Sequence, residues 1–224
     1  MRRHLVIAAY DKDYSWIRQI SSSVKTIAYR KGAAAKQSKD EIQLESNKGR
    51  CVHTFFNHIA VNYDNLADIT FFCQDYPFDH FEDLIDVVNN YKEAERCQLR
   101  IGGYYGFHYN SIKVPGPRGG IMWNLSESKH HGNGRVLICD NYGAPQDSNP
   151  LIDMKMYWNR FFNSEPPNNY EFMPGGHFAV TKEHAKLRSQ EYYYNICKFL
   201  QEEEVAPWII ERLECYIFNP NIKW

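Results

Sequence analysis

Short apolar runs that alternate with segments of helical periodicity constrain the fold of this chain most strongly. Such runs occupy residues 4–10, 24–29 and 67–73. Each run stops at a charged or polar cluster, as a strand buried on both faces of a sheet does. Strands that alternate with helices predict a largely parallel sheet with helices on both faces.

Apolar side chains at the 3.6-residue spacing of an amphipathic helix fill much of the remaining sequence. We expect helices at residues 13–20, from residue 50 onward, and at 81–88, 152–162, 182–200 and 207–218, with further strands at 135–139 and 178–180. Residues 33–46 are polar and small, which is typical of a loop, and residues 102–134 are rich in Gly, Pro, Tyr and Ser, which is typical of an irregular functional insertion. We therefore predict a single α/β domain with a central, mostly parallel mixed β-sheet flanked by helices.

The composition agrees with one buried core and excludes several functional classes. The chain has 224 residues, of which 43% are hydrophobic, and 26 Lys and Arg balance 27 Asp and Glu. A net charge of −1 provides no general attraction to nucleic acid or to an anionic membrane, so we expect neither as a partner, and any phosphate site must be local. The six cysteines show no close spacing, which favours free thiols in a reducing compartment. The apolar stretch near the N-terminus is too short for a membrane span. We therefore predict a cytoplasmic protein.

Aromatic residues are abundant, at 15% of the chain. They either fill the core or stack on bases and sugars. The periodicity assigns five phenylalanines to core faces, namely Phe55, Phe56, Phe71, Phe72 and Phe178. Five others fall at strand ends or in the glycine-rich segment, where a ligand would lie, namely Tyr10, Tyr29, Tyr104, Tyr105 and Trp123.

Polar side chains collect where the expected strands end. Ligands of open parallel sheets bind beyond the carboxyl ends of the strands. The groups at these positions are Tyr10, Asp11 and Lys12, then Tyr29, Arg30 and Lys31, then Asn47, Lys48, Gly49 and Arg50 before a helix, and finally Asp75, Asp79 and His80. Cations, aromatic rings and carboxylates together suit a nucleoside diphosphate bound with a divalent metal.

The segment QDYPFDH, residues 74–80, has the richest chemistry. Mg²⁺ and Mn²⁺ prefer carboxylate oxygens, so Asp75 and Asp79 are candidate metal ligands. Asp79 is equally well placed to cap the helix expected at residue 81. His177 follows two glycines and is either a third ligand or an ordinary loop histidine. Glu211, on the last helix, is either a general base or a solvated helix residue.

Two long segments resemble a known family. They are NKGRCVHTFFNHIAVNYDNLADITFFCQDYPFDH and GGHFAVTKEHAKLRSQEYYYNICKFLQEEEVAPWIIERLECYIF. Together with the first strand, they resemble a domain family of unknown function that looks like a compact GT-A-type glycosyltransferase, similar to the N-terminal domain of a chlorella virus capsid-glycan enzyme. The resemblance implies a UDP-sugar donor, Mn²⁺ (or Mg²⁺), and transfer to a glycan or glycoprotein acceptor such as a viral capsid protein, compatible with retention at the anomeric carbon. It covers Gly49, Arg50, His53, Thr54, Gln74, Pro77, Asp79, His80, Gly175, Phe178, Glu211 and Arg212.

The resemblance assigns roles to the candidate residues. Residues 1–100 would form the nucleotide-binding half and residues 101–224 the acceptor half. Tyr10, Lys12, Tyr29, Arg30, Arg50 and Gln74 would bind the nucleotide, with Arg50 on the phosphates; Asp75, Asp79 and His177 would bind the metal; Glu211 and Asp79 would serve catalysis; and Tyr104, Tyr105 and Trp123 would stack on sugar rings. Cys51 stands where the family usually has Glu. That difference favours the alternative function, a noncatalytic nucleotide- or carbohydrate-binding module.

Overall fold

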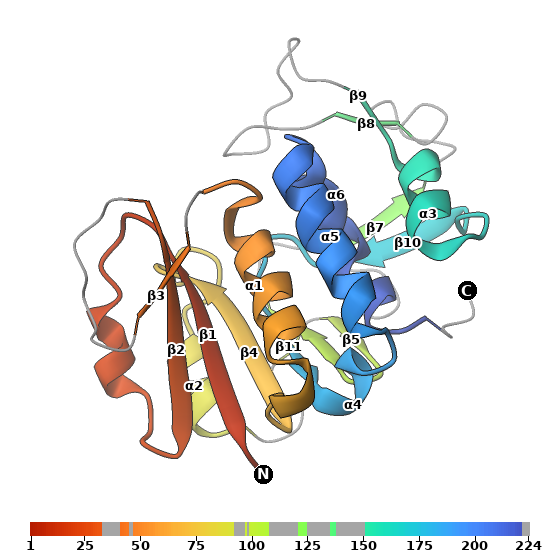
Figure 1. The fold of residues 1–224 in the computed structure, drawn as a ribbon. Helices are drawn as coiled ribbons and strands as arrows, with labels where there is room; N and C mark the ends of the chain where they lie inside the picture. Colours follow the sequence, from red (N-terminus) through yellow and green to blue (C-terminus); the bar gives the residue numbers. More distant parts are fainter. Residues whose placement is uncertain are drawn as a thin grey trace.

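A seven-stranded mixed sheet forms the centre of the molecule (Figure 1). The computed structural model describes residues 1–32, 41–44, 47–91, 97, 99–107, 121–124, 135–137 and 151–220. The strand order of the sheet is β3-β2-β1-β4-β11-β6-β5. The predicted α/β fold with a mixed sheet flanked by helices is confirmed.

The sheet consists of a parallel half and an antiparallel half. The strands β1 (Arg3–Ala9), β2 (Val24–Lys31), β3 (Ile42–Leu44) and β4 (Ile69–Gln74) are parallel. The strands β11 (Phe178–Thr181), β6 (Tyr104–Gly106) and β5 (Leu99–Ile101) extend the sheet from β4 in antiparallel pairings. Two small sheets pair β10 (Asn169–Phe172) with β7 (Ile121–Asn124) and β8 (Arg135–Leu137) with β9 (Leu151–Asp153).

Helices cover both faces of the parallel half (Figure 1). One face carries α1 (Arg50–Val61), against which α5 (Gln190–Glu202) and α6 (Ala206–Ile217) pack. The other face carries the 3-10 helix η1 (Ser15–Gln19) and α2 (Leu84–Asn89). The remaining helices are α3 (Met154–Phe162), α4 (Lys182–Ala185) and the 3-10 helix η2 (Tyr63–Asn65).

Strand β1 shows why an uninterrupted apolar run forms this layer. Val6 and Ala8 pack into the cluster under α1, whereas Leu5, Ile7 and Ala9 pack into the cluster under η1 and α2. Because successive side chains of a strand point to opposite faces, a strand covered on both faces needs apolar residues at every position.

The aromatic residues lie mainly in the core. The five phenylalanines predicted there are all fully buried. Tyr104 and Tyr105 are also buried, at 1% and 4% exposure, and Tyr104 stacks between Phe178 and Phe218. The prediction that these two tyrosines stack on acceptor sugars is therefore wrong. Trp123 lies on β7, and most of the insertion around it, residues 108–120 and 125–134, falls outside the described residues.

Several element boundaries differ from the prediction. The segment expected as one helix over residues 182–200 forms α4 and α5, because Thr181 and Ser189 each cap a new start by accepting a backbone N–H three residues later. Residues 13–20 contain only the short η1, and the segments expected as loops contain β3, β6 and β7. No helix in the described part of the chain is long and apolar enough to span a membrane.

Candidate functional site

A cavity of about 250 Å³ lies at the carboxyl ends of β1, β2 and β4, beside the N-terminus of α1. This is the position at which open parallel sheets bind ligands. Its walls contain cationic, acidic and aromatic side chains. The lining residues are Ala8, Ala9, Tyr10, Asp11, Lys12, Lys31, Asn47, Arg50, Cys51, Gln74, Asp75, Tyr76 and Asp79.

Asp75 fixes the loop that follows β1. Its Oδ2 accepts the backbone N–H groups of Tyr10, Asp11 and Lys12 at 2.9, 3.1 and 3.0 Å, and its Oδ1 accepts that of Tyr76 at 3.0 Å. The side chain is buried. A carboxylate offers about four lone-pair sites, so these four bonds leave Asp75 little capacity for a metal ion. Its role in this structure is to position the cavity loop.

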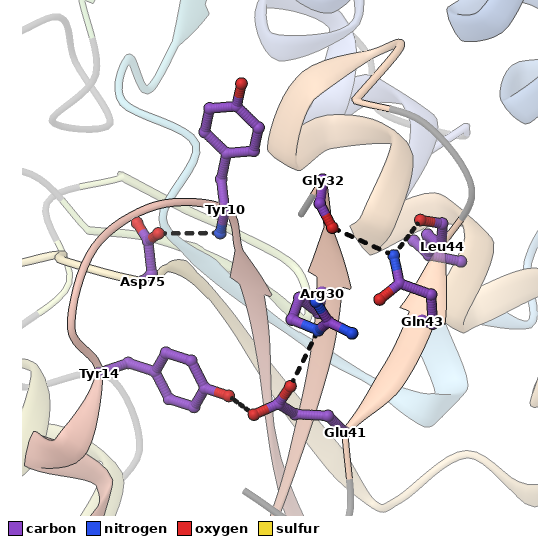
Figure 2. A network of polar contacts seen from close by, with 8 residues as sticks. All are labelled: Tyr10, Tyr14, Arg30, Gly32, Glu41, Gln43, Leu44 and Asp75. Atoms are coloured by element: carbon purple, nitrogen blue, oxygen red, sulfur yellow. Dashed lines mark hydrogen bonds and ion pairs between the residues drawn. The ribbon is translucent and has the colours of Figure 1, made fainter. Parts of the chain in front are cut away.

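Tyr10 places an exposed aromatic ring at the rim of the cavity. Figure 2 shows its side chain directed away from Asp75, which holds only its backbone. Tyr10 as a residue is 48% exposed. Its ring lies against Gly32, since a Cβ added to Gly32 would be 3.0 Å from Cε2 of Tyr10. The ring is therefore held in place by its contact with Gly32 and is still accessible to solvent, as a stacking surface for a base or a sugar must be.

Arg50 and Lys12 bring cations to the same cavity. The Arg50 guanidinium lies over the ring of Trp208, 4.4 Å from its centroid, which holds the side chain at the first turn of α1. Gly49 and Arg50 both adopt positive φ, at 69° and 49°, and Gly49 is irreplaceable there because an added Cβ would lie 2.9 Å from the backbone oxygen of Leu200. The turn presents the helix N-terminus to the cavity, where anions are favoured.

Two predicted nucleotide ligands lie away from the cavity. Tyr29 is 2% exposed, and its hydroxyl is hydrogen-bonded to Nδ1 of His58 at 3.0 Å in the core, so the expectation that it contacts the nucleoside is corrected. Arg30 points to the other face of β2, where its Nε lies 3.2 Å from Oε2 of Glu41. Figure 2 shows Tyr14 donating its hydroxyl to the same carboxylate. These contacts hold the β2–β3 edge, as does Gln43.

Lys31, the residue after Arg30, lines the cavity instead. Its side chain is 1% exposed, and its Nζ donates to the carbonyl oxygens of Lys48 and Arg50 at 2.9 and 2.6 Å. Both cations follow this strand in the sequence, and the prediction names Arg30, not Lys31, as a nucleotide ligand. The alternation of side chains along β2 is the signal that separates them, since Lys31 shares its face with Tyr29 and α1.

Gln74 closes the cavity on the side of the loop that contains Gly175. Its Nε2 lies 3.4 Å from the carbonyl oxygen of Gly175 and 3.7 Å from Sγ of Cys51. Burial raises the pKa of the Cys51 thiol to about 12. The thiol is therefore neutral and has no acid–base role near neutral pH. Gln74 acts here as a link between β4, α1 and the loop before β11.

Glu211 lies on α6 and interacts with the backbone N–H of Gly175, the residue whose carbonyl contacts Gln74. Burial raises the pKa of its carboxyl, and the shift is opposed by Arg212, by the backbone N–H of Gly175, and by His80 and Arg50. Glu211 therefore interacts with Arg50, which lines the cavity, although Glu211 itself does not form part of the cavity wall. A carboxyl with a raised pKa near a pocket is a candidate general base.

The three expected metal ligands do not form one site. Asp79 lines the cavity with a side chain that is 60% exposed, and its Oδ1 lies 3.9 Å from Nε2 of His80. Asp79 is not a helix cap, because α2 begins at Leu84 after Asp83. His177 is buried, with its ring 5.5 Å from that of His80. Over the ranges that the structure describes, no group of three or more His, Cys, Asp or Glu side chains is placed to hold a metal ion.

Comparison with known sequences agrees with the extent of the fold. The sequence profile of DUF3431, described as a protein of unknown function, matches residues 5–221. The chain belongs to the DUF3431 family. A search of curated proteins found no match. The DUF3431 match includes most of β1, the whole cavity wall and Glu211, so the site described above lies entirely within the family domain.

Proposed function

We propose that this DUF3431 protein is a glycosyltransferase that binds a UDP-sugar in the cavity and transfers the sugar to a glycan or glycoprotein acceptor. The observation that carries the proposal is the meeting of Lys12, Lys31 and Arg50 with the exposed ring of Tyr10 at the carboxyl edge of parallel strands. A nucleoside diphosphate needs a stacking surface for its base and positive charge for its phosphates. The cavity offers both within one wall.

The described residues divide the work of such a reaction. Tyr10 stacks on the base or ribose, while Arg50, Lys12 and the N-terminus of α1 bind the diphosphate and stabilise its charge as the bond to the sugar breaks. Glu211 interacts with the backbone N–H of Gly175 and belongs to the half of the chain expected to bind the acceptor. Its carboxyl, with a raised pKa, can accept the proton of an attacking hydroxyl.

A divalent metal would supply Lewis-acid stabilisation of the same diphosphate. The residues expected to hold it do not fit that role in this structure, because Asp75 is engaged by four backbone N–H groups and lies outside any three-ligand group among the described residues. No step of the proposed reaction is assigned to a metal.

Thermal-shift titration with UDP, GDP and CMP, each with EDTA or with Mn²⁺, tests the proposal. We expect selective stabilisation by UDP, because ligands that bind only the native state raise the melting temperature. Arg50→Ala should weaken UDP binding about tenfold or more, since it removes a charge-assisted contact. Arg160→Ala is the matched control. Arg160, on the distant helix α3, also stacks on an aromatic ring, with its guanidinium 4.6 Å from the ring centroid of Phe199. Equal responses to all nucleotides, or none, would refute the proposal.

A noncatalytic binding module on the same fold is the second candidate. The observation that favours it is the neutral Cys51 thiol in the cavity wall, where the resembled family usually has a carboxylate. Both candidates predict UDP binding. Slow release of free sugar from UDP-sugars, lost in Glu211→Gln, supports the enzyme, whereas tight binding with no turnover in the presence of acceptor sugars supports the module.

A further inference from the structure

Lys31 is a buried cation, and no carboxylate among the described residues is paired with it. Within the described chain, its Nζ has two hydrogen-bond acceptors, the carbonyl oxygens of Lys48 and Arg50. An ammonium group has three donors, so one N–H has no acceptor among the described residues. The residue lines the cavity, and its side chain is 1% exposed, so water outside the cavity does not solvate the charge.

The described groups that surround Lys31 do not balance its charge. Cys51 on α1 and Cys197 on α5 are the titratable groups that interact with it, and burial raises the pKa of both thiols to about 12, so both are neutral. His53 on α1 also faces it, and burial followed by the Lys31 charge lowers the pKa of His53 to about 4. Arg50 adds a second positive charge at the cavity wall.

Such an arrangement is unfavourable unless an anion completes it. Removing an ion from water costs several kcal/mol even after relaxation of the protein, and two carbonyl dipoles compensate only part of that cost. The cost appears here as a pKa of Lys31 lowered to about 8, chiefly by burial. A buried cation that lines a cavity is well explained by a ligand that brings negative charge to that cavity.

We propose that Lys31 provides the buried counter-charge for the diphosphate of the bound nucleotide, and that it and Arg50 neutralise this group without a divalent metal. This inference rests on the proposed function, because it assumes a nucleoside diphosphate ligand. It also explains the lack of a three-ligand metal group among the described residues. In this proposal, Lys31 contacts the ligand when one is bound. Without the ligand, it contacts the turn at the start of α1.

Calorimetric titration with UDP at pH 8 in EDTA, and again with Mn²⁺, tests the inference. We expect the dissociation constant of UDP to change less than threefold on addition of Mn²⁺. Lys31→Met should weaken binding in EDTA by at least tenfold. The control is Lys25→Met, which removes an exposed lysine from the same strand, far from the cavity, and should leave binding unchanged.

Proton uptake separates a ligand contact from a structural role. With a pKa of about 8, Lys31 is about half protonated at pH 8, and a bound diphosphate would complete its protonation. Titrations in buffers with different ionisation enthalpies should therefore show uptake of about half a proton per UDP, because the phosphate itself is already ionised at this pH. Lys31→Arg, which keeps the charge but cannot titrate, should bind UDP without uptake.

The outcomes distinguish the inference from the proposed function. UDP binding that requires Mn²⁺, or binding without proton uptake in the wild-type protein, overturns the role of Lys31 and leaves the UDP-binding proposal intact. No binding of UDP with or without Mn²⁺ overturns both. If Lys31→Met fails to fold because the α1 turn loses its support, the wild-type uptake and the Lys31→Arg variant still decide the question.

Discussion

Replacing Asp75 with alanine should destabilise the protein strongly, because this carboxylate organises a whole loop. The substitution removes the acceptor for four backbone N–H groups at 2.9–3.1 Å. Hydrogen bonds to charged groups contribute about 1.5–3 kcal/mol each, although the exposed loop of residues 10–12 regains water as a partner. We therefore expect a net loss of about 3 kcal/mol, equivalent to a fall of about 6–12 °C in melting temperature for a chain of this size.

Urea unfolding followed by circular dichroism measures this loss. Asp75→Asn should lose about half as much stability, because one amide oxygen can accept the three loop N–H groups while its NH₂ faces the N–H of Tyr76. Asp79→Ala is the control, since its exposed carboxylate should change stability by less than about 0.5 kcal/mol. An Asp75→Ala protein with the wild-type urea midpoint would show that Asp75 does not hold the loop and is available for another role.

Two further perturbations test the folded core. Gly49→Ala should destabilise the protein by more than about 1 kcal/mol, because it forces alanine into a φ of 69° against Leu200; an unchanged melting temperature would contradict this packing. Burial lowers the pKa of His4, His53 and His58 to about 4, 4 and 3, so stability is fully present above pH 6.5 and lost as pH falls toward these values. His58 alone should cost about 2 kcal/mol between pH 7 and pH 5, and equal urea midpoints at the two values would refute this.

The parallel half of the sheet was predictable because its strands carry a local signature. β1 and β4 are covered on both faces and buried at nearly every position, so their runs are mainly apolar and end where the chain leaves the core. The antiparallel strands β5 and β6 are only three residues long, and the tyrosines and glycine of β6 are equally typical of a loop. Tyr104 and Tyr105 are core residues because β11 pairs with them, which is a contact with a distant segment.

The helix break between α4 and α5 shows a different limit. The apolar spacing continues across residues 186–189, and only the caps at Thr181 and Ser189 mark the two starts. Serine and threonine in a helical pattern are common, and their side chains act as caps only when the chain geometry places them at a start.

The location of the candidate site followed from topology, whereas the roles of its residues depended on hydrogen bonds. The carboxyl ends of adjacent parallel strands had to meet, and Tyr10, Lys12, Arg50 and Asp79 do line one cavity. The sequence contains no sign that Asp75 accepts N–H groups from the loop after β1, because those partners lie more than sixty positions away. The same chemistry that suggested a metal ligand serves equally well to bind a backbone loop.

Burial, more than the count of charges, determines what the cavity attracts. Its wall contains three acidic and three basic side chains, so a count predicts no preference. Asp75 is turned toward backbone N–H groups, and Asp79 is 60% exposed to water, which screens its charge. Lys31 is 1% exposed and faces a medium of low polarity, where a unit charge acts several times more strongly than in water. The near-neutral chain therefore contains a cavity whose least screened charge is positive, and an anion such as a diphosphate is the ligand that this charge favours.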